Sequence, residues 1–120
     1  MYLVSMKKIE FYTHPVVGKE NKPTSEKYIM LSYFLSDLSD IETIERTVSE
    51  IELVQNNQKT FDEVFTNIYG TISISVNAGT FVCDKDTAYL ISSNPDLEPS
   101  LTLPLQEFIN ILEEWKTFLK

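Results

Sequence analysis

The fold is decided by the stretch from residue 71 to residue 83, which reads Thr71-Ile72-Ser73-Ile74-Ser75-Val76-Asn77-Ala78-Gly79-Thr80-Phe81-Val82-Cys83. Ile72, Ile74 and Val76 alternate with small polar residues, and a period of two is typical of a strand with one buried face. Asn77-Ala78-Gly79 tolerates positive φ, so we expect the chain to turn back through residues 80–83 as a hairpin. This stretch therefore predicts an antiparallel sheet.

Further strands are indicated on both sides of this hairpin. Downstream, Asp84-Lys85-Asp86 predicts a second turn into a strand over residues 87–92, which completes a three-strand meander, with an optional short extended piece over residues 100–103. Upstream, Ile9 and Phe11 alternate with polar residues in a strand that His14-Pro15 ends.

Two segments between residues 18 and 35 are interpreted differently. Residues 18–27 are polar and punctuated by Gly18 and Pro23, which predicts an exposed connection. Residues 28–35 are almost continuously apolar and rich in aromatic side chains, which indicates a central strand buried on both faces. The start of a helix is the competing interpretation, because periodicity alone does not separate the two.

Two helices are predicted from apolar spacing. Ser39-Asp40-Ile41-Glu42 has the form of a capping box, so a helix should begin at Ser39 and run to about Val54. At the other end of the chain, Pro104 fits the first turn of a closing helix whose apolar face packs across a sheet. Residues 59–70 fit either a short helix or a turn, and both remain open.

These elements predict an α+β protein in one domain over residues 1–120. Its antiparallel sheet has about four to five strands, with an acidic mid-chain helix nearby and a C-terminal amphipathic helix packed on the sheet. A chain of 120 residues with 42% hydrophobic content is long enough to close a core without metals or disulfides.

Negative charge is concentrated in the middle of the chain. Eight of the eighteen acidic residues fall between Asp37 and Glu63, against only Arg46 and Lys59, so this stretch carries −6 of the formal −8. Such a charge repels the phosphates of nucleic acids and anionic lipids. We therefore expect no binding to nucleic acid or membrane, and instead attraction of a basic protein.

No set of catalytic, cofactor-binding or metal-ligating residues is recognised. His14 is the single histidine, which excludes a two-histidine metal site, and three isolated glycines exclude a phosphate-binding loop. Cys83 is the single cysteine and has acidic neighbours, so we expect an inert thiol and a reducing compartment. With no signal peptide and no apolar run of about 20 residues, the expected location is the cytoplasm.

The candidate contact residues for a basic partner come from the acidic stretch. Glu45, Ser49 and Glu52 fall on one flank of the predicted helix without a basic partner in register. The predicted contacts are Asp37, Asp40, Glu42, Glu45, Glu52, Asp62 and Glu63, with Phe61 and Phe65 as apolar anchors if they are exposed. A merely solvated face is the alternative, and it gains support if these carboxylates point in several directions or pair with lysines of the same chain.

The closing segment resembles the last helix of small bacterial immunity proteins that accompany polymorphic or contact-dependent toxins. It reads Leu103-Pro104-Leu105-Gln106-Glu107-Phe108-Ile109-Asn110-Ile111-Leu112-Glu113-Glu114-Trp115-Lys116-Thr117-Phe118-Leu119. The order of predicted elements along the chain is similar as well. The resemblance implies a cytoplasmic inhibitor, without catalysis, that binds a cognate toxin domain, often a basic nuclease, as a monomer or weak homodimer. It assigns no individual binding residues.

Two rival functions are carried alongside this resemblance. A secretion chaperone of similar size and charge would bind an unfolded segment of an exported effector, and it would expose apolar grooves along a dimer. An enzyme that uses scattered carboxylates would need a concave pocket containing acids of strongly perturbed pKa.

Overall fold

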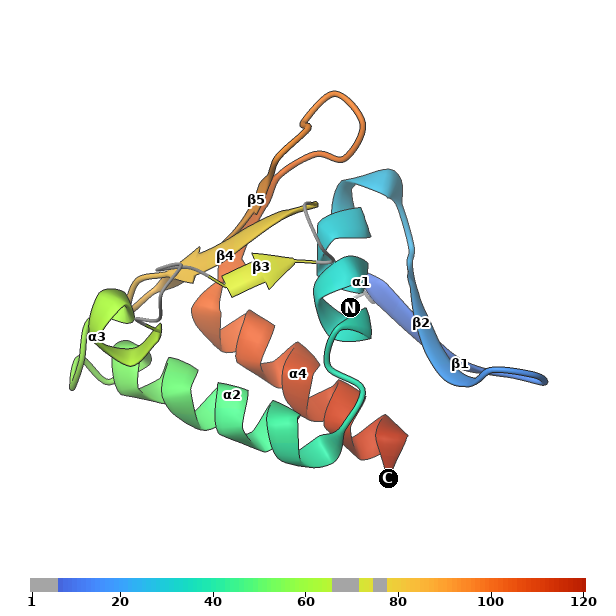
Figure 1. Ribbon diagram of the computed structural model, residues 1–120, viewed down its shortest axis with the longest axis horizontal. Coiled ribbons are helices and arrows are strands. Elements are labelled where there is room, and N and C mark those ends of the chain that lie inside the picture. Colours follow the sequence, from blue (N-terminus) through green and yellow to red (C-terminus); the bar gives the residue numbers. More distant parts are fainter. Residues whose placement is uncertain (1–6, 66–71, 75–77) are drawn as a thin grey trace, which may run out of the picture.

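Antiparallel strands and α-helices make up the protein, as Figure 1 shows. The computed structural model describes residues 7–65, 72–74 and 78–120, without the side chains of Phe65, Ile72 and Ser73. The described elements are β1 (Ile9–His14), β2 (Gly18–Pro23), the 3₁₀ turn η1 (Glu26–Tyr28), α1 (Ile29–Ser36), α2 (Ile41–Gln55), α3 (Phe61–Phe65), β3 (Ile72–Ile74), β4 (Gly79–Cys83), β5 (Thr87–Ser92), β6 (Leu101–Pro104) and α4 (Leu105–Leu119). The described strands form two sheets, ordered β1-β2 and β3-β4-β5-β6. The α+β class is confirmed, but the strands are divided between two sheets instead of forming one.

The larger sheet is built on the stretch that opened the sequence analysis. β3, β4, β5 and β6 pair in chain order, and every pair is antiparallel. Phe81 and Leu90 lie opposite each other on β4 and β5, and both are fully buried. The predicted strand residue Val76 and turn residue Asn77 lie outside the described residues. Between β4 and β5, the Asp84 carboxylate accepts hydrogen bonds from the N–H groups of Asp86 and Thr87, both at 2.8 Å, which holds the turn.

The prediction that residues 18–27 form an exposed connection is wrong. Residues 18–23 form β2, which pairs with β1 from Gly18 opposite His14 to Pro23 opposite Ile9. Polarity hid this strand, because most of its side chains stay in contact with water. The Thr24 N–H bonds to the Lys8 carbonyl, and hydrogen-bonded and non-hydrogen-bonded pairs alternate along an antiparallel ladder. Position 23 therefore donates no hydrogen bond to β1, so a proline, which has no N–H, is tolerated there.

The central strand predicted for residues 28–35 is also wrong, and the competing helix is what the structure contains. α1 begins at Ile29 and buries five of its eight residues, among them Met30, Leu31 and Phe34. Figure 1 shows why its apolar run is nearly continuous, since α1 stands between the larger sheet and the β1–β2 hairpin. A helix covered on most sides loses the polar stripe that would have distinguished it from a buried strand.

The start of α2 lies one residue later than the predicted capping box. Asp40, not Ser39, is the N-cap, with φ −131° and ψ 139°. Its carboxylate accepts from the Thr43 N–H at 3.2 Å and from the Thr43 hydroxyl. A charged acceptor at the N-cap also interacts favourably with the helix dipole, which favours the Asp40 carboxylate over the Ser39 hydroxyl as the cap.

Three aromatic rings join the layers of the protein. Phe34 of α1, Phe81 of β4 and Phe108 of α4 lie with centroids 5.0–5.3 Å apart, and each is at most 3% exposed. α2 lies antiparallel to α4, as two contacts show: the Gln55 side chain bonds to Gln106 near the start of α4, and Glu45 pairs with Lys116 near its end. In Figure 1 these two helices run side by side below the larger sheet. The Trp115 indole N–H donates to the Leu38 carbonyl at 2.8 Å, which ties α4 to the α1–α2 connection.

Phe81→Ala is expected to lower the free energy of unfolding by about 3–5 kcal/mol, because it removes the ring in contact with both Phe34 and Phe108 and leaves a cavity. Urea unfolding monitored by circular dichroism measures this change. Tyr12→Ala is the control, since Tyr12 is 37% exposed and should cost less than about 1 kcal/mol. Equal losses at the two positions would contradict this account of the core.

Two glycines should respond differently to alanine. A Cβ at Gly79 would overlap the Ile91 carbonyl oxygen and lie 2.5 Å from the Met30 Cε, so Gly79→Ala should cost about 3 kcal/mol or more. A Cβ at Gly18 would meet nothing within 4 Å, but φ there is +93°, so Gly18→Ala should cost about 1–2 kcal/mol through backbone strain. Denaturant midpoints of both variants test this order, and a larger loss at Gly18 would contradict it.

Candidate protein-binding surface

Three of the predicted contact residues lie on α2. Ile44, Val48, Ile51 and Val54 form its buried stripe. The 3.6-residue period of a helix places Glu42 opposite this stripe, and Glu45 and Glu52 on one flank beside it. All three carboxylates are exposed, but they do not share one side of α2.

Glu45 is already paired within the chain. Its Oε2 lies 3.6 Å from the Nζ of Lys116 on α4, and the same ammonium lies 3.0 Å from Oε1 of Glu113. The pKa of Lys116 is raised above its usual value, first by its hydrogen bond to Glu113 and less by Glu45. One lysine thus offsets part of the negative charge where α2 and α4 meet.

Three more of the predicted acidic residues have local structural positions. Asp40 caps α2, and the hydrogen bond from Thr43 holds the pKa of its carboxyl below the usual range. Glu63 and Thr60 form a capping box at the start of α3, with Thr60 N–H to Glu63 Oε1 at 2.8 Å and Glu63 N–H to the Thr60 hydroxyl at 3.2 Å. Asp37 follows α1 and donates its N–H to the Tyr33 and Phe34 carbonyls, both at 3.2 Å.

Of the two predicted aromatic anchors, Phe61 and Phe65, the structure describes the side chain of Phe61. Phe61 is half-buried against the core, with its ring centroid 6.0 Å from that of Phe81. The side chain of Phe65 lies outside the described residues. Phe61 therefore supports the core, although part of it still reaches solvent.

Glu42, Glu52 and Asp62 remain, and we call them the acidic surface. All three are exposed, and no salt bridge of residues 7–65, 72–74 and 78–120 involves them. Glu42 and Glu52 are ten positions apart on α2, about 15 Å along the helix and about 80° around it, and Asp62 lies on α3. The acidic surface is smaller than the predicted set of seven carboxylates, because Asp40, Glu45 and Glu63 already take part in helix caps or an ion pair.

The single histidine and single cysteine serve the fold. The His14 Nδ1 accepts hydrogen bonds from the N–H groups of Val16 and Val17, at 3.0 and 3.2 Å, and so holds the β1–β2 turn. Cys83 points into the core, where burial, with a smaller effect of Asp84, raises the pKa of its thiol to about 12. Among the described residues, no group of three or more histidine, cysteine, aspartate or glutamate side chains is arranged to hold a metal ion.

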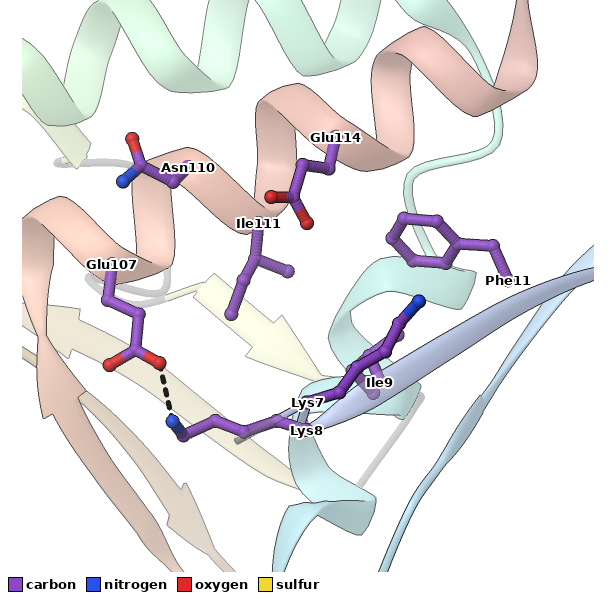
Figure 2. Close-up of a pocket in the computed structure, with 8 residues that line it drawn as sticks. All are labelled: Lys7, Lys8, Ile9, Phe11, Glu107, Asn110, Ile111 and Glu114. Atoms are coloured by element: carbon purple, nitrogen blue, oxygen red, sulfur yellow. Dashed lines mark hydrogen bonds and ion pairs between the residues drawn. The ribbon is translucent and has the colours of Figure 1, made fainter. Parts of the chain in front are cut away.

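Sequence analysis missed a groove between β1 and α4. Figure 2 shows Ile111 and Glu114 projecting from α4 toward β1, with Ile9 and Phe11 on the opposite side. Its volume is about 440 Å³, and it is lined by Lys7, Lys8, Ile9, Phe11, Glu107, Asn110, Ile111 and Glu114. A second hollow of about 480 Å³ shares Lys7, Phe11 and Glu114 with it and continues to Phe118. Because the two walls are about a hundred positions apart in sequence, no local pattern could have revealed the groove.

Comparison with protein-family models, with curated proteins and with solved structures found no match. The resemblance to immunity proteins therefore stays an expectation drawn from residues 103–119. In the part of the chain that the structure describes, no helix combines the length and apolar character needed to cross a bilayer.

Cys83 should resist alkylation in the folded protein at pH 8, because its raised pKa leaves almost no thiolate. The same raised pKa makes the free energy of unfolding depend on pH. The thiol is protonated in both states below about pH 9, so stability is unaffected there, and it falls as pH rises from 9 toward 12, where only the unfolded state ionises freely. Mass spectrometry after iodoacetamide treatment, with and without urea, measures the difference, and rapid labelling of the native protein would contradict it.

Proposed function

We propose that this protein is an immunity protein that binds a cognate bacterial toxin domain, such as a nuclease domain, and neutralises it by stoichiometric protein–protein binding. It acts in the cytoplasm as a monomer or weak homodimer, and without catalysis. The acidic surface carries the proposal, because Glu42, Glu52 and Asp62 are exposed and lack ion-pair partners among the described residues. Carboxylates that folding leaves unpaired raise the rate at which a basic partner is captured.

The positions of the two reactive side-chain types favour binding over chemistry. His14 accepts two main-chain hydrogen bonds, and Cys83 is buried and protonated. A nucleophile needs an adjacent base within hydrogen-bond reach, and neither side chain is placed to serve the other in this way.

The runner-up is an acidic secretion chaperone that binds an exported effector, and the groove between β1 and α4 favours it. An apolar floor formed by Ile9, Phe11 and Ile111 suits an extended segment better than a folded domain. Size-exclusion chromatography with light scattering separates the two functions, since a chaperone should form a stable dimer with one unfolded client.

Neutralising the acidic surface should slow association with the toxin domain. The triple variant Glu42→Gln, Glu52→Gln, Asp62→Asn removes three charges and leaves the helix caps and the Glu45–Lys116 pair intact. We expect the association rate constant to fall about tenfold at low salt and much less at high salt. The immunity function expects an exported protein to be encoded immediately upstream, and its C-terminal domain is the ligand for this test. Stopped-flow fluorescence measures the rate.

A matched control removes the same number of charges elsewhere. Glu26→Gln, Asp96→Asn, Glu98→Gln changes exposed or half-buried residues of η1 and of the connection between β5 and β6. Equal slowing by both triple variants would assign the effect to net charge and contradict the proposed surface. A failure of the domain to bind even the unaltered protein would reject the immunity function itself.

A further inference from the structure

The edge of β1 that faces away from β2 has no strand partner among the described residues. The Thr24 N–H bonds to the Lys8 carbonyl at 3.0 Å, and the register continues with Glu10 opposite Lys22 and Tyr12 opposite Glu20. Hydrogen-bonded and non-hydrogen-bonded pairs alternate in an antiparallel ladder. The N–H and C=O groups of Ile9, Phe11 and Thr13 therefore point away from β2.

These main-chain groups border the groove. In Figure 2, β1 lies between β2 and the groove, and α4 forms the opposite wall. The main-chain groups of Ile9 and Phe11 point away from β2, and their side chains, together with that of Ile111, form the apolar floor of the groove. An open sheet edge beside an apolar trough is the arrangement to which an extended peptide adds as a further strand.

Charge at the rim defines what such a peptide should carry. Lys8 and Glu107 pair across the groove at 2.5 Å, and Glu113 pairs with Lys116. Lys7 and Glu114 also line the groove, and neither takes part in a salt bridge of the described residues. A basic side chain directed toward α4 would pair with Glu114, and an acidic one beside β1 would pair with Lys7.

We propose that an extended segment of a partner protein adds to β1 as a third strand and fills the groove. Its alternate side chains are apolar and lie on Ile9, Phe11 and Ile111, and a basic residue faces Glu114. This surface is distinct from the acidic surface, and the inference does not rest on the immunity function.

The test uses the full chain and a blocked peptide of about six residues that alternates valine and threonine and ends in lysine. Strand addition makes a specific pattern in amide hydrogen exchange measured by NMR. At about 1 mM peptide, exchange at Ile9, Phe11 and Thr13 should slow at least tenfold, while Glu10 and Tyr12, which already bond to β2, should change little. Uniform slowing, or none, overturns the proposal.

Two variants locate the peptide in the groove. Ile111→Glu places a charge on the floor and should weaken binding at least tenfold. Glu114→Lys should weaken binding of the lysine peptide about threefold to fivefold and strengthen binding of the same peptide ending in glutamate. Glu98→Lys, outside the groove, is the control and should change neither affinity. Unchanged peptide binding in both single variants, Glu114→Lys and Ile111→Glu, overturns the proposal. If one of them folds poorly, unchanged binding in the other overturns it.

Other occupants of the groove give different results. Slow exchange at Ile9, Phe11 and Thr13 without peptide, independent of protein concentration, would mean that another part of the same chain covers the edge. Slow exchange that appears only at high protein concentration would mean that a second copy covers it. Either result overturns a peptide partner.

Discussion

The contact of Phe34, Phe81 and Phe108 is the constraint on which the rest of the structure depends. One ring comes from a helix early in the chain, one from the larger sheet and one from the last helix. Because all three are buried, no layer can shift without opening a cavity at the centre. The position of α4 follows from this contact, and so does the position of the groove wall that Glu107, Ile111 and Glu114 form.

A second aromatic contact places the hairpin. Phe11 of β1 lies 5.2 Å from Trp115 and 5.4 Å from Phe118, measured between ring centroids. Lys19 of β2 reaches the same end of α4, where its ammonium donates to the main-chain oxygen of Lys120 at 2.6 Å. An isolated two-stranded hairpin is only marginally stable, so these contacts keep β1 beside α4. The same contacts hold β1 at the distance that leaves the groove open.

Sequence patterns predicted the parts of the fold in which side-chain polarity reports burial directly. The alternation over residues 72–92 marked successive antiparallel strands because one face of that sheet is covered. A strand was preferred over the helix α1 because cover on most sides removed the polar stripe of that helix. β2 was missed because exposure left it without an apolar stripe. In both segments the neighbours in space set the pattern, and those neighbours are not readable from the segment itself.

The proposed binding surface was harder to predict, because a carboxylate has several uses that look alike in sequence. Asp40 and Glu63 begin helices, and Glu45 meets a lysine from α4, 71 positions away. Of the seven predicted carboxylates, the acidic surface keeps Glu42, Glu52 and Asp62. The groove had no sequence signal, since Lys8 and Glu107 are brought together by folding alone.

α2 packs on one flank of α4 and β1 lies at the other, so the acidic surface of α2 and α3 is separated from the groove. Gln106 and Lys116 face α2, whereas Glu107, Ile111 and Glu114 face β1. The helical period separates these two sets by roughly half a turn. A folded domain held on the α2 side therefore leaves the groove open, and an extended segment in the groove leaves the acidic surface free. Two separate partners, one on each surface, need not compete.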